Sequence, residues 1–187
     1  MDKKELRKIV FSRRRKASDE EVKEKSRAIF EQIMRSDHYR NASSVFCYMD
    51  HKHEVMTREF IEQCWRDGKK VAVPKVNGKI MNFYYIEYFG QLEPGVMGIL
   101  EPVTHCPGIV QNADHDEDAL FIIPGVAFDG ERHRIGYGGG YYDKYQAEHT
   151  WHTTMAVAFE FQIFDAVPFD AYDICPRYLV TENRIIQ

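Results

Sequence analysis

Residues 121–145 read FIIPGVAFDGERHRIGYGGGYYDKY, and this is the most informative stretch of the chain. The apolar run over residues 119–124 is typical of a buried strand, and it ends in a Pro-Gly pair. A polar loop follows, then a segment rich in glycine at residues 136–140, and residues 141–149 have helical composition. A strand, a glycine-rich loop and a helix in this order are typical of α/β proteins.

Helices and strands alternate along the rest of the chain. Apolar spacing predicts helices over residues 3–15, from Ser18 to about residue 36, and over 56–66; short apolar runs predict strands at 45–49, 71–74, 119–124, 155–159 and 178–180. Asn77-Gly78 is a tight-turn signal, and it predicts a hairpin that leads into residues 81–86. The fold class predicted for residues 1–187 is a single-domain three-layer α/β/α sandwich with a mostly parallel, mixed, Rossmann-like sheet.

Composition narrows the function classes. The chain has 187 residues, 44% of them apolar and 29% charged, which is an ordinary balance for one globular domain. No apolar run is long enough for a membrane span, and the charged N-terminus is unlike a secretory signal, so we expect a cytoplasmic protein with no membrane partner. The net charge of −4 argues against nucleic-acid binding.

Three further groups of residues carry weaker signals. Cys47, Cys64, Cys106 and Cys175 contain no C-x-x-C pair, so a zinc or redox site is not expected, and the first two fit a reducing compartment. Residues 1–16 are strongly basic; one or two of these side chains could reach an anionic ligand, and residues 13–16 are expected to form a solvated face. The acidic residues 114–118 are expected to be exposed, and the irregular residues 90–108 suggest a binding loop.

The glycine-rich loop is a candidate anion cradle. Glycines let the backbone approach a phosphate, and the N-terminus of the following helix favours negative charge. Arg134 suits phosphate oxygens, Asp143 suits Mg²⁺, and Tyr141 and Tyr142 offer aromatic faces and hydroxyls. The spacing matches neither a P-loop nor the dinucleotide fingerprint, because Tyr141 stands where the latter needs its third glycine. A plain flexible β–α connection is the alternative.

The residues around this loop resemble a known family. The decisive match is RIGYGGGYYD at residues 134–143, with PGVAFD at 124–129 upstream, KKELR at 3–7 and GILEP at 98–102. In order and spacing these segments resemble the 5-formyltetrahydrofolate cyclo-ligases, also called methenyltetrahydrofolate synthetases. The resemblance implies an ATP-dependent ligase of one-carbon metabolism that cyclises 5-formyltetrahydrofolate to 5,10-methenyltetrahydrofolate and releases ADP and phosphate.

Site residues follow from the resemblance position by position. Tyr141 and Arg134 are the implied catalytic residues. The implied ATP-binding residues are Lys3, Lys4, Arg7, Arg134, Ile135, Gly136, Tyr137, Gly138, Gly139, Gly140, Tyr141 and Tyr142. The implied folate-binding residues are Glu54, Arg7, Tyr137, Gly138, Gly139, Gly140 and Tyr141.

The implied cofactor is Mg²⁺, with ATP as co-substrate. Asp143 is the first expected ligand and Asp173 the second, with Asp129 in reserve, although an Asp-Gly pair is often only a turn. The family often has another acid four residues after the position of Asp173, whereas this chain has Arg177. Residues 51–54 (HKHE) offer a competing interpretation as a metal cluster, but no further His or Cys motif completes it.

Two other functions stay open at this point. A sugar-phosphate isomerase could use the glycine loop for a ligand phosphate, and a non-catalytic nucleotide or folate sensor could use the same fold. Neither needs Asp143 for turnover. The expected partners are 5-formyltetrahydrofolate and ATP, with no nucleic acid, and the expected assembly is a monomer or a small homo-oligomer.

Overall fold

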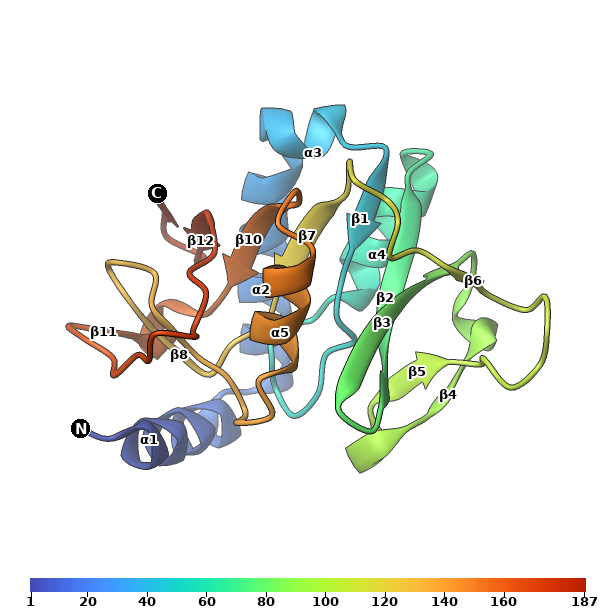
Figure 1. Cartoon of the computed structure of the whole chain (residues 1–187). Coiled ribbons are helices and arrows are strands. Elements are labelled where there is room, and N and C mark those ends of the chain that lie inside the picture. The colour runs from blue at the N-terminus through green and yellow to red at the C-terminus, as the bar shows by residue number, and fades with distance from the viewer.

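The computed structural model describes residues 1–187, apart from the side chain of Val96. An eight-stranded sheet in the order β13-β12-β10-β7-β1-β2-β3-β6 forms its centre (Figure 1). The strands of this sheet are β1 (Ser44–Phe46), β2 (Lys70–Asn77), β3 (Ile80–Ile86), β6 (Gln111–Asn112), β7 (Leu120–Ile123), β10 (Thr153–Val157), β12 (Tyr178–Val180) and β13 (Ile185–Ile186).

Parallel pairing dominates the middle of this sheet. β1 pairs in parallel with both β2 and β7, and β10 pairs in parallel with β7 and β12. The outer pairings are antiparallel: β2 with β3, β3 with β6, and β12 with β13. The Asn77-Gly78 turn closes the β2–β3 hairpin, with Asn77 opposite Ile80 and Gly78 at a φ of +62°. The predicted mixed, mostly parallel sheet and its antiparallel hairpin are confirmed.

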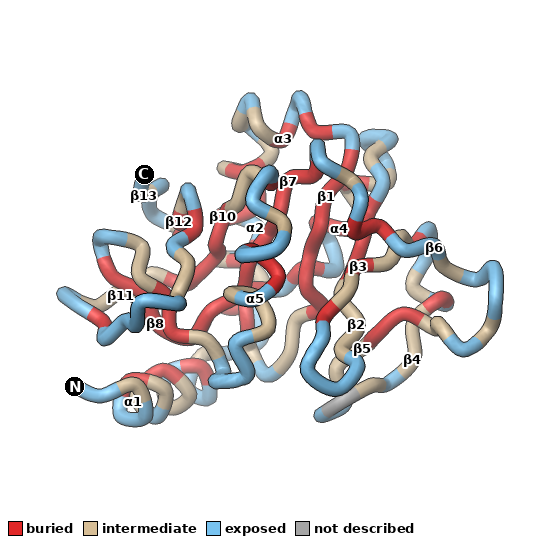
Figure 2. Tube along the Cα trace, in the orientation of Figure 1, coloured by how far each residue is buried: buried red, intermediate tan, exposed pale blue. Residues whose placement is uncertain are grey.

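Helices cover both faces of the sheet. The helices are α1 (Lys3–Lys16), α2 (Asp19–Met34), α3 (Asp37–Asn41), α4 (Arg58–Arg66) and α5 (Tyr141–Glu148), with short 3₁₀ turns η1 (Phe89–Gln91), η2 (Val96–Gly98) and η3 (Glu160–Gln162). Buried residues of α2, α3 and α4 pack with Val45 and Val71 on one face, whereas Tyr145 of α5 packs with Phe46 and Phe121 on the other. The two strands at the centre of the sheet, β1 and β7, are accordingly buried along their whole length (Figure 2). This arrangement confirms the three-layer α/β/α sandwich.

Two smaller sheets flank the main one. β8 (Ala127–Asp129) lies between β11 (Ile163–Phe164) and β9 (Arg134–Ile135), and β4 (Leu92–Pro94) pairs with β5 (Leu100–Pro102). Leu6 and Val10 of α1 pack against the first of these sheets in a third apolar cluster. Helix α1 therefore lies beside the segment that leads from β7 to the glycine-rich loop (Figure 1).

The structure corrects two expectations about exposure. Asp114 is buried rather than exposed: its carboxylate accepts hydrogen bonds from the backbone of Phe83 and from the side chains of Asn82 and Tyr145. Arg14 is also buried, with 3% exposure, although Arg13 and the two residues that follow Arg14 are exposed as expected. Both charged side chains form hydrogen bonds with groups inside the protein, and such bonds offset the cost of burying a charge. Along the described residues, no helix combines the length and apolar character that crossing a bilayer requires.

Candidate active site

A cavity of about 490 Å³ opens at the carboxyl ends of the parallel strands. Tyr48 and Met49 follow β1 and line one side, and Pro124 follows β7 and lines the other. The chain continues from β1 to β2 on one side, whereas β7 lies on the other side, so the order of strands reverses at this point. Such a switch point is where open α/β sheets bind ligands.

The glycine-rich loop forms one wall of the cavity. Residues 134–143 all line it. Gly138 has a φ of +107° and Gly140 a φ of +65°, a backbone region that costs side chains free energy. Gly140 is the N-cap of α5, so the first N–H groups of this helix lie beside the cavity, where they favour an anion. Tyr141, the first helical residue, donates a 3.1 Å hydrogen bond from its hydroxyl to the carbonyl of Gly78 in the β2–β3 turn.

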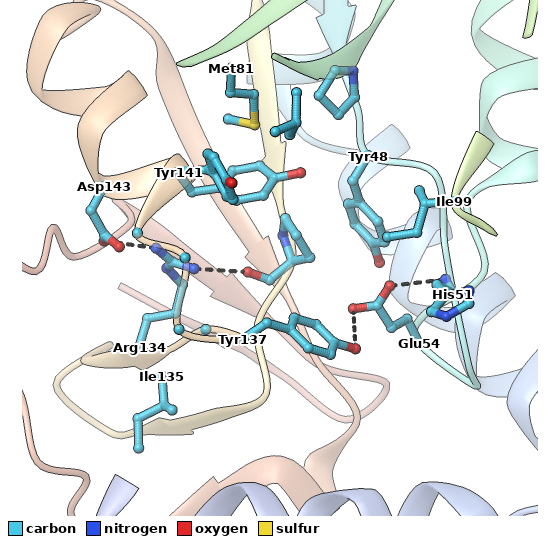
Figure 3. Close-up of a pocket in the computed structure, with 18 of the residues that line it drawn as sticks. Tyr48, His51, Glu54, Met81, Ile99, Arg134, Ile135, Tyr137, Tyr141 and Asp143 are labelled. Carbon is cyan, nitrogen blue, oxygen red and sulfur yellow. Dashed lines mark hydrogen bonds and ion pairs between the residues drawn. The ribbon is translucent and has the colours of Figure 1, made fainter. Parts of the chain in front are cut away.

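Arg134 is held by polar groups on both sides of the loop. Its Nη2 donates to Asp143 Oδ1 at 2.7 Å, and its Nη1 donates to the carbonyl oxygen of Pro124 at 3.3 Å (Figure 3). The guanidinium is almost fully buried, while its Nε finds no partner among the described residues. Arg7 of α1 reinforces the same loop by donating from Nε to the carbonyl of Gly136 at 2.8 Å. The wall thus presents two guanidinium groups to the cavity.

A carboxylate-rich corner lies next to this wall. Lys3 of α1 donates to Asp170 at 2.7 Å and to Asp173 at 2.8 Å, and all three line the cavity. The backbone N–H of Ile174, next to Asp173, donates to Asp143 Oδ1 at 3.2 Å. Burial acts to raise the pKa of Asp173, but the hydrogen bonds from Lys3 and from the backbone of Asp170 hold it below its ordinary value. Asp143 and Asp173 therefore line the same corner of the cavity.

This corner fits a magnesium ion that arrives with a nucleotide. Within the described part of the chain, no three His, Cys, Asp or Glu side chains are placed to hold a metal by themselves, so the alternative cluster at residues 51–54 is not supported. Mg²⁺ usually takes one or two carboxylates and completes its shell with phosphate oxygens and water. Asp143 uses only Oδ1 in the hydrogen bonds described above, which leaves Oδ2 as a hard oxygen donor.

The reserve ligand Asp129 does not lie in this corner. Its two oxygens accept hydrogen bonds from the His133 ring at 2.9 Å and from the backbone N–H groups of Glu131, His133 and Val167 at 3.0 Å each. The residue is buried and does not line the cavity. Asp129 therefore organises the turn after β8, as an Asp-Gly pair commonly does.

Glu54 lies across the cavity from the glycine loop. Its Oε1 accepts a 2.9 Å hydrogen bond from the Tyr137 hydroxyl, and its Oε2 accepts one of 2.9 Å from the backbone N–H of His51 (Figure 3). Burial raises the pKa of Glu54 above its ordinary value, although Arg14 and these two hydrogen bonds oppose that rise. The result is a buried acid in a fixed orientation on the cavity wall.

The remaining wall is apolar. It consists of side chains from the β2–β3 hairpin and from the segment around β5, namely Pro74, Val76, Met81, Met97 and Ile99. Glu101 of β5 is a second buried acid that lines the cavity. The sequence predicted a binding loop over residues 90–108, and the positions of Met97, Ile99 and Glu101 give that loop a place in the cavity. Nothing in the sequence singled out Met81 or Ile99 individually.

Most residues named from the sequence come together here. Of the predicted site residues, two are absent from the cavity lining: the reserve ligand Asp129, which is buried elsewhere, and Lys4, which is exposed on α1. Sequence reasoning missed Tyr48, Asp170 and the buried Arg14, and it considered His51 only as a metal ligand. Arg14 did carry a signal, because Leu6, Val10 and Arg14 recur every four residues and form the buried face of α1.

Comparisons with known proteins give a consistent family assignment. The family model described as 5-formyltetrahydrofolate cyclo-ligase matches residues 1–182. The chain belongs to the 5-formyltetrahydrofolate cyclo-ligase family. A curated relative from Schizosaccharomyces pombe is described as a probable 5-formyltetrahydrofolate cyclo-ligase. It is 30% identical to this chain, and the match covers 100% of this chain and 98% of the relative. The Escherichia coli K12 5-formyltetrahydrofolate cyclo-ligase is 26% identical over 95% of this chain and 98% of its own.

Two solved structures share the fold of this chain. The 5,10-methenyltetrahydrofolate synthetase of Aquifex aeolicus superposes with a TM-score of 0.86 at 32% identity, covering 100% of this chain and 93% of its own. The synthetase of Mycoplasma pneumoniae gives a TM-score of 0.77 at 22% identity over 97% of this chain and 99% of its own, which supports the fold. Both likenesses extend over nearly the whole sandwich and its flanking sheets.

Proposed function

We propose that this chain, acting as one domain over residues 1–187, catalyses the ATP- and Mg²⁺-dependent cyclisation of 5-formyltetrahydrofolate to 5,10-methenyltetrahydrofolate. The observation that carries the proposal is the composition of the cavity in a member of this family. A glycine loop at a helix N-terminus and three cationic side chains, Lys3, Arg7 and Arg134, face the same space as two buried acids and a group of apolar side chains. Four free cysteines, two of them buried, favour a reducing cytoplasmic location.

The two halves of the cavity suit the two substrates. The nucleotide phosphates would lie along residues 136–140 and the N-terminus of α5, where backbone N–H groups and guanidinium groups neutralise their charge. The pterin ring would lie against the apolar wall with its N–H groups directed at Glu54, because a carboxylate can accept two such hydrogen bonds at once. Met81 and Ile99 would then cover the faces of the ring.

The chemistry needs the two substrates side by side. A formamide carbon is a poor electrophile and its oxygen leaves poorly as water. We propose that the formyl oxygen attacks the γ-phosphorus and ADP leaves; N10 then attacks the formyl carbon and loses its proton, and the C–O bond breaks to release phosphate. Arg134 and the loop amides would stabilise the charge on the transferring group, while Tyr141 at the loop–helix junction would orient it.

Asp143 and Asp173 are the side chains that would hold Mg²⁺. When bound, the ion would neutralise charge on the phosphate oxygens. Asp143 would also keep Arg134 in place through the 2.7 Å hydrogen bond, so the metal ligand and the phosphate-binding group depend on one another.

An isotope experiment tests this route. The formyl oxygen of the substrate is labelled with ¹⁸O, the reaction is run with unlabelled ATP, and the phosphate released is analysed by mass spectrometry. We expect one labelled oxygen in each phosphate, because the route transfers the formyl oxygen to phosphorus. Product formation with unlabelled phosphate would refute the phosphorylated intermediate while leaving the overall reaction in place.

A further inference from the structure

Arg14 is a buried cation outside the cavity lining. It lies in the last turn of α1 beside the exposed Arg13 and Arg15, yet only 3% of it is exposed. Its Nη2 donates to the carbonyl oxygen of Gly125 at 2.8 Å, and its Nε has no partner among the described residues. A buried guanidinium is costly unless its charge is balanced, so a nearby acid is expected.

That balancing acid is Glu54. Arg14 Nη1 donates to the Tyr137 hydroxyl at 2.8 Å, and this hydroxyl donates to Glu54 Oε1 at 2.9 Å. Arg14 Nη1 also lies 3.7 Å from Glu54 Oε1, with both side chains almost fully buried. The three groups therefore form a directed chain, in which each hydrogen bond polarises the next.

This series of hydrogen-bonded groups begins outside the cavity at Arg14 and ends on the cavity wall at Glu54. Glu54 and Tyr137 line the cavity, whereas Arg14 does not, so Arg14 reaches a ligand only through them. The other oxygen of Glu54 is fixed by the backbone of His51. Arg14 fixes Tyr137 from the opposite side and anchors it to the carbonyl of Gly125, just after β7. The orientation of the Glu54 carboxylate thus depends on a residue that cannot touch the substrate.

We infer that Arg14 is a positioning residue, which orients the Tyr137 hydroxyl and keeps the Glu54 carboxylate aligned for the folate. The inference rests on the proposed cyclisation of 5-formyltetrahydrofolate, since it assigns Glu54 to that substrate. It predicts a larger effect on the folate half of the cavity than on the nucleotide half, because Arg14 contacts the glycine-rich loop only at the Tyr137 hydroxyl, which points to Glu54.

The charge balance around Glu54 gives a second signature. The groups that act on this carboxylate are Arg14 on α1, Tyr137 and Tyr142 across the cavity, and Tyr48, Asp50 and His51 on its own segment. Burial raises the pKa of Glu54, and Arg14 is the leading opposing influence. Without Arg14 the pKa of Glu54 would rise further. As the pH is lowered, kcat/KM for the folate would therefore begin to fall at a higher pH than in the wild-type protein.

Steady-state kinetics with three variants tests the inference. Arg14→Gln should raise KM for 5-formyltetrahydrofolate by roughly tenfold or more and leave KM for ATP within about twofold, because a hydrogen bond to a charged group is lost on one side of the cavity only. The acidic limb of kcat/KM for the folate should move to higher pH. Arg14→Lys keeps the positive charge but loses the planar guanidinium with its several donors. It should return the acidic side of the pH profile toward its wild-type position. Arg15→Gln, an exposed neighbour with the same charge change, is the control.

Tyr137→Phe completes the design. If Arg14 acts through this hydroxyl, Arg14→Gln should add little to the effect of Tyr137→Phe on KM for the folate. A folded Arg14→Gln protein with wild-type KM values and an unmoved limb would overturn the inference, as would equal increases in both KM values. Should Arg14→Gln fail to fold, wild-type values in both Arg14→Lys and Tyr137→Phe would overturn it. No turnover by the wild-type protein would instead refute the proposed function.

Discussion

Arg134 Nη2 lies 2.7 Å from Asp143 Oδ1, and this bond joins the first residue of β9 to the first turn of α5 across the glycine-rich loop. Arg134 is almost fully buried at the cavity wall, whereas Asp143 is partly open to the cavity. The loop between them is therefore closed by an ion pair whose two members line the same cavity. Changes at either end should act on the loop geometry and on the charge of the site together.

Asp143→Asn should separate an Mg²⁺–ATP enzyme from the isomerase and sensor alternatives. The amide is a weaker metal ligand and no longer balances Arg134, so we expect kcat to fall by roughly 100-fold, the scale seen when one preorganised electrostatic group is removed. Glu148→Gln, an exposed change at the other end of α5, should keep wild-type kcat. Full ATP-dependent turnover by Asp143→Asn would rule out the metal assignment.

Gly138→Ala tests whether the loop geometry binds phosphate. The φ of +107° is unfavourable for alanine, and relief of about 1–3 kcal/mol of strain would displace the loop amides. We expect KM for ATP to rise about tenfold with a smaller change in KM for the folate. Gly130→Ala is the matched control, because an added Cβ there meets no atom within 4 Å. An unchanged KM for ATP would mean that the phosphates bind elsewhere.

Tyr141→Phe asks whether this hydroxyl takes part in the reaction. Loss of its hydrogen bond to the Gly78 carbonyl alone would cost about 1 kcal/mol, or roughly fivefold in kcat/KM. We expect a larger loss, about 100-fold in kcat, if the hydroxyl also orients the transferring group. Tyr172→Phe, on a side chain that is 89% exposed, should have no effect. A loss of only fivefold or less would assign Tyr141 to closing the cavity against the hairpin.

His152 should make stability depend on pH. It is buried in an aromatic cluster with Phe46 and Phe121, neither ring nitrogen has a hydrogen-bond partner among the described residues, and burial lowers its pKa to about 4. An unfolded chain binds the proton near pH 6.5, whereas the folded chain resists it, so the stabilisation is complete above about pH 6.5 and is lost as the pH falls toward 4. The loss attributable to His152 should reach roughly 3 kcal/mol.

Urea denaturation at several pH values measures this effect. His152→Phe should flatten the dependence of the free energy of unfolding on pH between 7 and 4, whereas His115→Gln, at an exposed position, should keep the wild-type slope. Equal slopes in His152→Phe and the wild-type protein would show that other groups cause the loss of stability in acid.

Local patterns predicted most elements of this fold. The Asn77-Gly78 hairpin, the capped start of α2 at Ser18 and the glycine-rich loop before α5 each depend on neighbours in the sequence, and each was predicted. The three-stranded sheet β11-β8-β9 was not predicted, because its strands are two or three residues long and pair across distant segments. Strands this short carry no alternation that could be recognised.

Charged residues were harder to place than apolar ones. Asp114 and Arg14 lie within strongly charged runs, and composition alone assigns such runs to solvent. Both are buried because a specific set of distant groups satisfies them: Phe83, Asn82 and Tyr145 for the acid, and Gly125, Tyr137 and Glu54 for the base. Those partners are known only once the chain has folded.

The most direct test of the central claim follows the product itself. Purified protein is mixed with (6S)-5-formyltetrahydrofolate, ATP and Mg²⁺, and methenyltetrahydrofolate is followed by its near-ultraviolet absorbance, with parallel reactions that omit ATP or replace Mg²⁺ by a chelator. We predict an increase that requires both ATP and Mg²⁺ and is matched by an equal amount of ADP. A folded protein that gives no increase, or an increase that persists without ATP, would contradict the account.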